Sequence, residues 1–260
     1  MVLNDISLLD QQVSNRIRSA QVIVGIESAI KELIENSLDS NCRNIDVRFQ
    51  EYGLESMEVI DDGCGIKKPD FDKLTKRNYT SKLRQDDLTS VTTYGYRGEA
   101  LFALSHLSKL TITSRHGSEK FGTKAQFENG QLVNTSSIAR EVGTTVIVSR
   151  LFENIPVRRH ELVKQMRKQF SRAEQTIEAY SLISRNVRIS FSNSLLSISV
   201  LKPKMAWSSL GGNSLEINLE FLVGKSVFDT FLQLEPIKVE ISSTQRRGCS
   251  KATVSITGKL

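Results

Sequence analysis

The chain has 260 residues, of which 39% are hydrophobic and 25% charged, so it is long enough for a substantial core and typical of globular proteins. It has no run of 18 apolar residues, which excludes a membrane-spanning helix, and residues 1–16 lack the pattern of a secretory signal. Three widely spaced cysteines favour a reducing compartment over a disulfide framework or a zinc site, and the net charge of +6 permits an anionic partner without requiring one.

The first strong helical pattern covers residues 26–40, after a polar lead-in and a short helix within 11–26. Its apolar residues recur at helical spacing and predict a core-facing side: Ile26, Ile30, Leu33, Ile34 and Leu38. Glu32 and Asn36 are four residues apart and therefore project from one side of the helix. A carboxylate and a carboxamide so placed could hold an attacking water and a magnesium ion. The alternative is an ordinary amphipathic helix with a solvated polar face.

Two alternating runs, 44–49 and 56–61, predict antiparallel strands joined by a turn at 51–53. The second strand runs into the sequence DDGCGI, which begins at Asp61. Its two glycines allow a tight turn and the close approach of a flat ligand to the backbone. Asp61 could accept a hydrogen bond from the exocyclic amine of adenine, although a turn whose aspartates cap the next helix would also explain the motif.

Residues 67–94 are polar and lack a core stripe, which indicates either disorder or a lid that a ligand orders. Within them, YTSK offers two hydroxyls and an ammonium as possible phosphate contacts. The next motif, GYRG at 95–98, precedes a helix with an apolar face. Glycines before a helix expose backbone N–H groups to an anion, so this motif predicts a phosphate contact. It matches neither the lysine-bearing phosphate loop nor the GxGxxG dinucleotide loop.

Strands are then predicted at 109–115, 122–128, 131–138 and 143–152, with a hairpin turn at Asn129-Gly130. A long helix is predicted over 156–184, starting at Pro156. Its expected core stripe comprises Val163, Met166, Phe170, Ala173, Ile177 and Tyr180. A basic stripe on another face comprises Lys164, Arg167, Lys168 and Arg172. This stripe is either a solvated face or a contact to the phosphates of DNA.

The last part of the chain predicts a hairpin at 187–201, a linker at 202–214, a short helix, and two strands within 237–243 and 252–260. Helices and antiparallel strands together indicate an α+β protein with helices on one face of the sheet. Two strands and a helix do not bury their own faces, so the second domain is expected to be incomplete.

The motifs KELIENSLDS, DDGCGI, YTSK, GYRGEALFAL and GTTVIVSRLFENIPVRRHEL occur here in the order and spacing of one family. They resemble the amino-terminal ATPase region of the MutL mismatch-repair proteins, most closely the PMS-type eukaryotic subunit. The resemblance covers residues 14–200 and fades afterwards. It implies a GHKL (Bergerat) ATP-binding sandwich at 1–200, with an antiparallel or mixed sheet, and a truncated S5-like α/β domain at 201–260.

The resemblance also implies roles for individual residues. Glu32 would be the general base for the attacking water, and Asn36 would bind the Mg²⁺ that bridges the phosphates of ATP. Asp61 would accept from the adenine amine, with Gly65 lining the base pocket and Thr144 supporting it. The phosphate cradle would comprise Thr80, Ser81, Lys82, Gly95, Tyr96, Arg97 and Gly98.

Three departures from the family pattern bear on these roles. The family has asparagine where this chain has Asp62, and an extra carboxylate would repel phosphate unless it points away or binds metal. Ala20 replaces a glycine, which matters only if the backbone there needs positive φ. The second-domain lysine that reaches the γ-phosphate in the family lies beyond this chain, so hydrolysis is expected to be weak.

The resemblance thus predicts Mg²⁺-dependent ATP binding and hydrolysis in DNA mismatch repair, with ATP-driven dimerisation of the amino-terminal regions. The implied partners are a second MutL-type subunit in a heterodimer, a MutS-type recogniser and DNA, with no membrane, and the implied location is the nucleus. The main alternative is a module that binds nucleotide, partner or DNA without hydrolysis. A histidine kinase or chaperone relative and a DNA-binding protein with a vestigial pocket are further alternatives; His106 and His160 lie within predicted helices, which disfavours phosphoacceptor roles.

Overall fold

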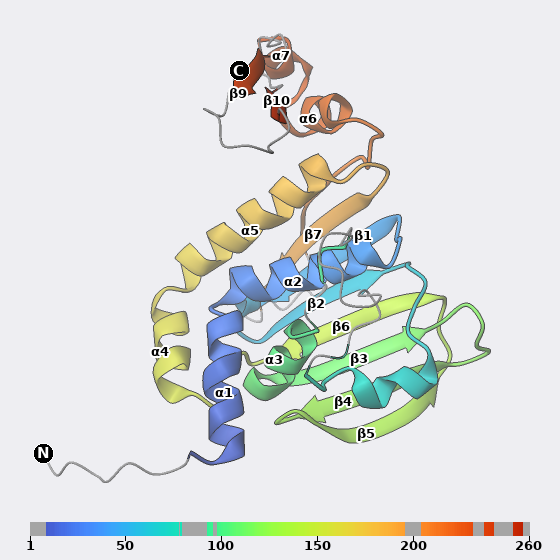
Figure 1. Cartoon of the computed structure of the whole chain (residues 1–260), viewed down its shortest axis with the longest axis vertical. Coiled ribbons are helices and arrows are strands. Elements are labelled where there is room, and N and C mark those ends of the chain that lie inside the picture. The colour runs from blue at the N-terminus through green and yellow to red at the C-terminus, as the bar shows by residue number, and fades with distance from the viewer. Residues whose placement is uncertain are drawn as a thin grey trace, which may run out of the picture.

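A computed structural model of the chain describes residues 9–77, 79, 93–95, 98–195, 204–230, 237–241 and 252–256. Within these ranges an eight-stranded sheet has the order β5-β4-β3-β6-β2-β1-β7-β8 (Figure 1). Neighbouring strands are antiparallel except β1 and β7, which are parallel, so the sheet is mixed as expected. The strands are β1 Asn44–Gln50, β2 Ser56–Asp61, β3 Lys109–Arg115, β4 Gly122–Glu128, β5 Gln131–Ile138, β6 Gly143–Ser149, β7 Arg188–Ser194 and β8 Lys204–Ser208.

The helices confirm most of the predicted ones. They are α1 Gln11–Val22, α2 Ile26–Asp39, α3 Ala100–Leu107, α4 Pro156–Lys164, α5 Met166–Ile183, α6 Leu215–Val223 and α7 Lys225–Phe228, with short 3-10 turns η1 Glu51–Gly53 and η2 Lys68–Lys73. In Figure 1, α2 and α3 lie across one face of the sheet, with α5 alongside α2 and α1 against α3. A second, two-stranded antiparallel sheet pairs β9 Ile237–Ile241 with β10 Ala252–Ile256. No described helix is long and apolar enough to cross a bilayer.

The core lies between the helices and this face of the sheet. The apolar stripe of α2 is buried as its spacing predicts, because Ile26, Ile30 and Ile34 are each fully inaccessible. Aromatic rings join the sheet to α5: Phe49 packs edge-on against Phe191 at 5.2 Å and against Phe170 at 6.0 Å between ring centroids. The contact between Phe49 and Phe170 holds α5 against the sheet.

The strand register places a polar row at one end of an apolar face. Across β2, β6 and β3, Asp61 pairs with Thr144, which pairs with Ser114. The neighbouring row on the same face is apolar, since Val59 lies opposite Val146. Side chains two residues apart along a strand lie on the same face of the sheet, so the polar row lies on the core-facing side, directly next to the apolar row. Three buried polar side chains therefore meet where β2 ends.

The long helix predicted for 156–184 is two helices, α4 and α5, with a break at Gln165 (φ −104°, ψ 16°). The break changes the direction in which residues before it point. Val163, predicted to be in the core, is consequently 49% exposed, whereas Leu162 is buried. The core positions Ala173, Ile177 and Tyr180 of the second helix are confirmed.

The linker predicted at 202–214 is wrong over Lys204–Ser208, which forms β8 and extends the large sheet by pairing with β7. The buried Asn218 of α6 also donates hydrogen bonds to the carbonyls of Leu182 and Ser184 at 3.1 and 3.2 Å. Chain beyond residue 200 therefore packs on the first sheet and α5, and the division at residue 200 stays a prediction. Residues 196–201 of the predicted hairpin lie outside the described residues.

Candidate functional site

A cavity of about 1290 Å³ opens beside α2, and five of the residues predicted for the site line it. Its walls come from the end of α1, from α2, from the turn after β2, from η2 and from the start of α3. The predicted residues on its walls are Glu32, Asn36, Gly65, Gly95 and Gly98. Thr80, Ser81, Lys82, Tyr96 and Arg97 lie outside the described residues.

Glu32 and Asn36 line the same cavity, as their four-residue spacing predicts. Both are partly buried. Lys31 lies near Glu32, with its Nζ atom 4.0 Å from Glu32 Oε1. The predicted pairing of a carboxylate and a carboxamide on one wall is therefore observed, while their chemical roles stay predictions.

Asp61, at the end of β2, is only 7% exposed and is held by several donors. Ser37 Oγ of α2 donates to it at 3.0 Å and the Gly63 N–H at 3.0 Å, with Ser40 Oγ further away at 3.4 Å. Burial raises the pKa of the Asp61 carboxyl above its usual value, and these hydrogen bonds oppose that shift. The donors meet the requirement that a buried aspartate be matched by hydrogen bonds.

Ser114, which the sequence did not single out, fixes the turn that follows Asp61. Its hydroxyl accepts from the Ile66 N–H at 2.8 Å, donates to the Gly143 carbonyl at 3.0 Å and lies 2.9 Å from Thr144 Oγ1. Ser114 thereby ties the end of the glycine turn to β6. Its only sequence signal is the position in a strand register that appears once the pairing is known.

Gly65 occupies a position where only glycine fits. Its φ of +74° is in the left-handed region, and a Cβ atom there would lie 2.0 Å from the carbonyl oxygen of Arg115. The predicted tight turn is thus observed at this residue, while the predicted approach of a flat ligand to the backbone stays a prediction. The close approach in this structure is to the chain's own backbone at the end of β3.

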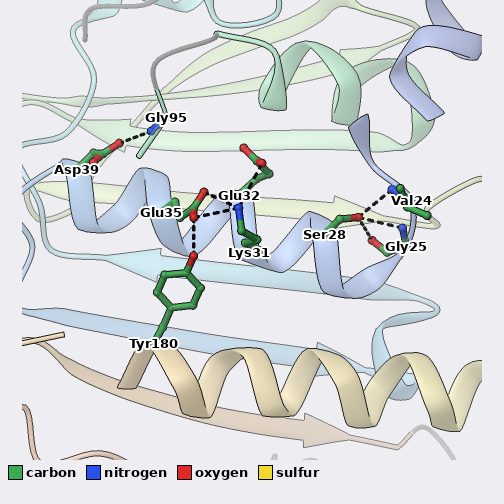
Figure 2. A network of polar contacts seen from close by, with 9 residues as sticks. All are labelled: Val24, Gly25, Ser28, Lys31, Glu32, Glu35, Asp39, Gly95 and Tyr180. Carbon is green, nitrogen blue, oxygen red and sulfur yellow. Dashed lines mark hydrogen bonds and ion pairs between the residues drawn. The ribbon is translucent and has the colours of Figure 1, made fainter. Parts of the chain in front are cut away.

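The segment 93–95 is attached to the carboxyl end of α2. Asp39 accepts from the backbone N–H of Tyr94 at 3.1 Å and of Gly95 at 2.9 Å; Figure 2 shows the second of these bonds. The Gly95 N–H, predicted to meet phosphate, therefore bonds to Asp39 in this structure. Gly98, with φ +62°, lies close to the backbone of Tyr79.

Known proteins resemble this chain in sequence and in fold. Residues 24–151 match the family model of histidine kinase-, DNA gyrase B- and HSP90-like ATPases. Mismatch repair endonuclease PMS2 of Gallus gallus is 39% identical over 236 residues, which make up 89% of this chain and 27% of that protein. The N-terminal domain of a DNA repair protein superposes with a TM-score of 0.80 at 29% identity, covering 94% of this chain and 70% of that one.

The chain belongs to the MutL family. It is a PMS-type amino-terminal ATPase region, and its fold is the GHKL fold that the sequence predicts. The Aquifex aeolicus MutL ATPase domain complexed with ADP superposes with a TM-score of 0.59 at 25% identity, covering 84% of this chain and 76% of that one. The chain spans about a quarter of the length of the curated PMS relatives it matches.

Asp62, which departs from the MutL pattern, points away from the cavity. Its carboxylate accepts from the backbone N–H groups of Arg43 and Asn44 at 2.7 and 2.9 Å and from Asn44 Nδ2 at 2.7 Å. Burial raises the pKa of Asp62, but these hydrogen bonds outweigh it and hold the pKa below its usual value. Asp62 is not among the residues that line the cavity, which removes the reason to expect that it repels a phosphate bound there. Ala20 lies inside α1 and is not among the residues with positive φ, so this replacement needs no glycine.

The side chains that line the cavity suit a Mg²⁺ ion that shares its ligands with a nucleotide better than a metal ion held entirely by protein side chains. In the described ranges there is no group of three or more His, Cys, Asp or Glu side chains that could hold a metal ion. Mg²⁺ is commonly held by one or two carboxylates together with phosphate oxygens and water. Asn36 lines the cavity and would offer a neutral carboxamide oxygen, with the remaining ligands coming from phosphate and water.

Proposed function

We propose that this chain binds ATP with Mg²⁺ in the cavity beside α2 and hydrolyses it. The observation that carries the proposal is that Glu32 and Asn36 of α2 line one cavity together with the Gly65 turn, which follows the buried Asp61. The ADP complex of the Aquifex aeolicus MutL ATPase domain, whose fold this chain shares, supports a nucleotide as the ligand.

In the proposed reaction Glu32 is the general base that orients a water toward the γ-phosphate. Asn36 holds the Mg²⁺ ion, which would neutralise charge on the phosphate oxygens. Asp61 accepts from the adenine amine, Gly65 lines the base pocket, and Thr144 supports the pocket through its hydroxyl contact with Ser114. The backbone N–H group of Gly98 contributes to the phosphate cradle, and that of Gly95 does so by exchanging Asp39 for a phosphate oxygen.

The experiment measures Mg²⁺-dependent ATP binding and turnover for the parent chain, Glu32→Gln and the control Glu27→Gln. Glu27 is an exposed residue in the first turn of the same helix, so its change removes an equal charge away from the cavity. We expect all three proteins to bind ATP and only Glu32→Gln to lose turnover, by roughly 100-fold or more. Equal turnover in Glu32→Gln and the parent would reject Glu32 as the base.

The alternative is a module that binds nucleotide without turnover. Parental binding with no turnover in any of the three proteins would establish this alternative and reject the hydrolysis proposal. Absence of binding would reject both. The outward position of Asp62 removes one of the two reasons that the sequence offered for the non-hydrolysing module.

We further propose that the chain acts in DNA mismatch repair in the nucleus, as part of a heterodimer with a second MutL-type subunit and together with a MutS-type recogniser. The similarity to PMS2 and PMS1 proteins supports this role. ATP would order the segment around Gly95 and favour dimerisation of the amino-terminal regions. Sedimentation with a candidate partner chain, with and without a non-hydrolysable ATP analogue, tests this; a sedimentation coefficient independent of nucleotide would contradict it.

DNA binding is proposed for the basic stripe of α4 and α5. Lys164, Arg167, Lys168 and Arg172 are all exposed, so they are available to phosphate groups. Each phosphate contact adds affinity that falls with salt concentration. Replacing two of these cations should reduce the salt dependence of DNA binding, and an unchanged salt dependence would exclude this surface.

A further inference from the structure

Lys31 lies directly before Glu32 in α2, and its ammonium group is close to two carboxylates. The Nζ atom lies 3.0 Å from Glu35 Oε1 and 4.0 Å from Glu32 Oε1. Adjacent residues on a helix do not face each other, whereas residues three or four apart do. Glu35 pairs with Lys31 four positions away and shares a face with Glu32 three positions away. The ion pair with Glu35 therefore holds the Lys31 ammonium on the side of α2 on which Glu32 lies.

Glu35 is itself held from another helix. Its side chain is 8% exposed, and the hydroxyl of Tyr180 on α5 donates to Glu35 Oε1 at 2.5 Å. Burial and the nearby Glu35 carboxylate raise the pKa of Tyr180 well above its usual value, so the phenol keeps its proton and remains a donor. Figure 2 shows the chain of contacts from Tyr180 through Glu35 and Lys31 to Glu32.

We propose that Lys31 is a positioning residue for Glu32, and that Glu35 and Tyr180 hold the Lys31 ammonium in place. This inference rests on the proposed function, in which Glu32 orients the attacking water. Two carboxylates three residues apart on one helix face repel each other, and a cation beside both offsets that repulsion. The Lys31 ammonium also restricts the orientation of the Glu32 carboxylate. A small misplacement of a base can cost much of the rate, so the effect falls on turnover.

A purely structural role is the main competing explanation, because the Glu35–Tyr180 bond also joins α2 to α5. The two explanations predict different effects for Lys31, whose side chain is 48% exposed. Loss of the ammonium leaves the buried Glu35 carboxylate without its cation, so a structural role appears as a lower stability in thermal unfolding. A positioning role lowers turnover in protein that is still folded at the assay temperature. A third explanation is that Lys31, which lines the cavity, binds phosphate directly. That role would appear in ATP affinity rather than in turnover.

The experiment measures kcat and the Kd for Mg²⁺-ATP in the parent chain, Lys31→Met, Lys31→Arg, Tyr180→Phe and the double variant of Lys31→Met with Tyr180→Phe. Two controls repeat the chemical changes elsewhere. Lys109→Met removes an exposed lysine that pairs with Glu128 at 3.8 Å. Tyr52→Phe removes the hydroxyl of a tyrosine whose ring packs on Phe170 of the same helix, α5, as Tyr180. Thermal unfolding of each protein reports folding separately.

We expect Lys31→Met to lower kcat roughly tenfold with Kd within about twofold of the parent, and Lys31→Arg to restore most of the rate. Tyr180→Phe should give a smaller loss, and the double variant should be no slower than Lys31→Met alone, because Tyr180 acts through Lys31. The controls should match the parent.

Parental kcat in Lys31→Met, while Glu32→Gln is inactive, would overturn this inference and leave the proposed function intact. A weaker Kd with unchanged kcat would make Lys31 a phosphate ligand and would also overturn it. Losses by Lys31→Met and Tyr180→Phe that simply add would remove Tyr180 from the proposal. Absence of turnover in the parent chain, in contrast, would reject the proposed function itself and this inference with it.

Discussion

Replacing Ser114 with alanine should destabilise the protein and weaken nucleotide binding, because one hydroxyl serves three buried or partly buried groups. It accepts from the Ile66 N–H at 2.8 Å, donates to the Gly143 carbonyl at 3.0 Å and contacts Thr144 Oγ1 at 2.9 Å. Each group left unsatisfied costs about 1–3 kcal/mol when buried. Ile66 is only partly buried and the Thr144 hydroxyl can rotate to a new partner, so we expect a total of about 2–3 kcal/mol.

The assay is urea unfolding followed by the fluorescence of Trp207, the only tryptophan of the chain, whose ring lies 6.0 Å from that of Phe191 in the core. For a domain of this size the expected loss corresponds to a fall in Tm of about 4–12 °C. ATP affinity, measured with a fluorescent analogue, should fall as well, because the turn that ends at Ile66 loses its attachment to β3.

Ser136→Ala on β5 is the matched control, because every residue of that strand is exposed. It should change the free energy of unfolding by less than about 0.5 kcal/mol. If Ser114→Ala has the same stability as Ser136→Ala and binds ATP as the parent does, Ser114 does not hold the turn and the reasoning from its contacts is refuted.

Three further predictions follow from single groups. Gly65→Ala should lower the free energy of unfolding by about 2 kcal/mol or more and abolish ATP binding, because the new Cβ would lie 2.0 Å from a backbone oxygen at φ +74°. Parental stability in calorimetry and parental affinity in an ATP titration would contradict the strained turn. Burial lowers the pKa of His106 below 6.5, so its contribution to stability is complete above about pH 6.5 and declines as the pH falls. The free energy of unfolding should therefore differ less between pH 7.5 and pH 5.5 in His106→Gln than in the parent. An equal difference would exclude His106 as a source of the pH dependence. Asp62→Ala should destabilise the chain above the ordinary aspartate pKa of 3.8 and leave ATP affinity unchanged. Its difference from the parent in free energy of unfolding should shrink as acid protonates Asp62. Reduced ATP affinity would place Asp62 in the site.

The elements were predictable where the pattern of apolar residues is local and regular. Alternation of Ile45, Val47 and Phe49 predicts β1, and the 3.6-residue spacing in 26–40 predicts α2. These residues are buried as expected, except Leu38, which is partly buried. The failures occur where the local pattern is interrupted. Nothing in the sequence around Gln165 signals the change in backbone direction there. A helical period that runs across the break therefore places Val163 in the core, which is wrong.

The site was predictable to the extent that its residues carry their own signal in sequence. The position of Asp61 at a strand end before two glycines and the spacing of Glu32 and Asn36 are such signals. Ser114 and Tyr180 carry none, because their importance comes from partners far away in the chain. Tyr180 meets Glu35 across 145 residues, and Ser114 meets Ile66 across 48. Contacts at such separations depend on sheet order and helix packing, which no local pattern contains.

Two polar residues of α2 are buried, since Glu35 is 6% and Ser37 4% exposed. Glu32 and Asn36 are partly buried, and their roles stay predictions. Three polar residues in the second half of the helix have different neighbours: Glu35 contacts Tyr180 of α5, Ser37 contacts Asp61 of β2, and Asp39 contacts the segment at Gly95. A buried polar group is costly unless it is paired, so these pairs restrict where α2 can lie. The helix is therefore the element through which α5, the sheet and the glycine segment are held around one cavity.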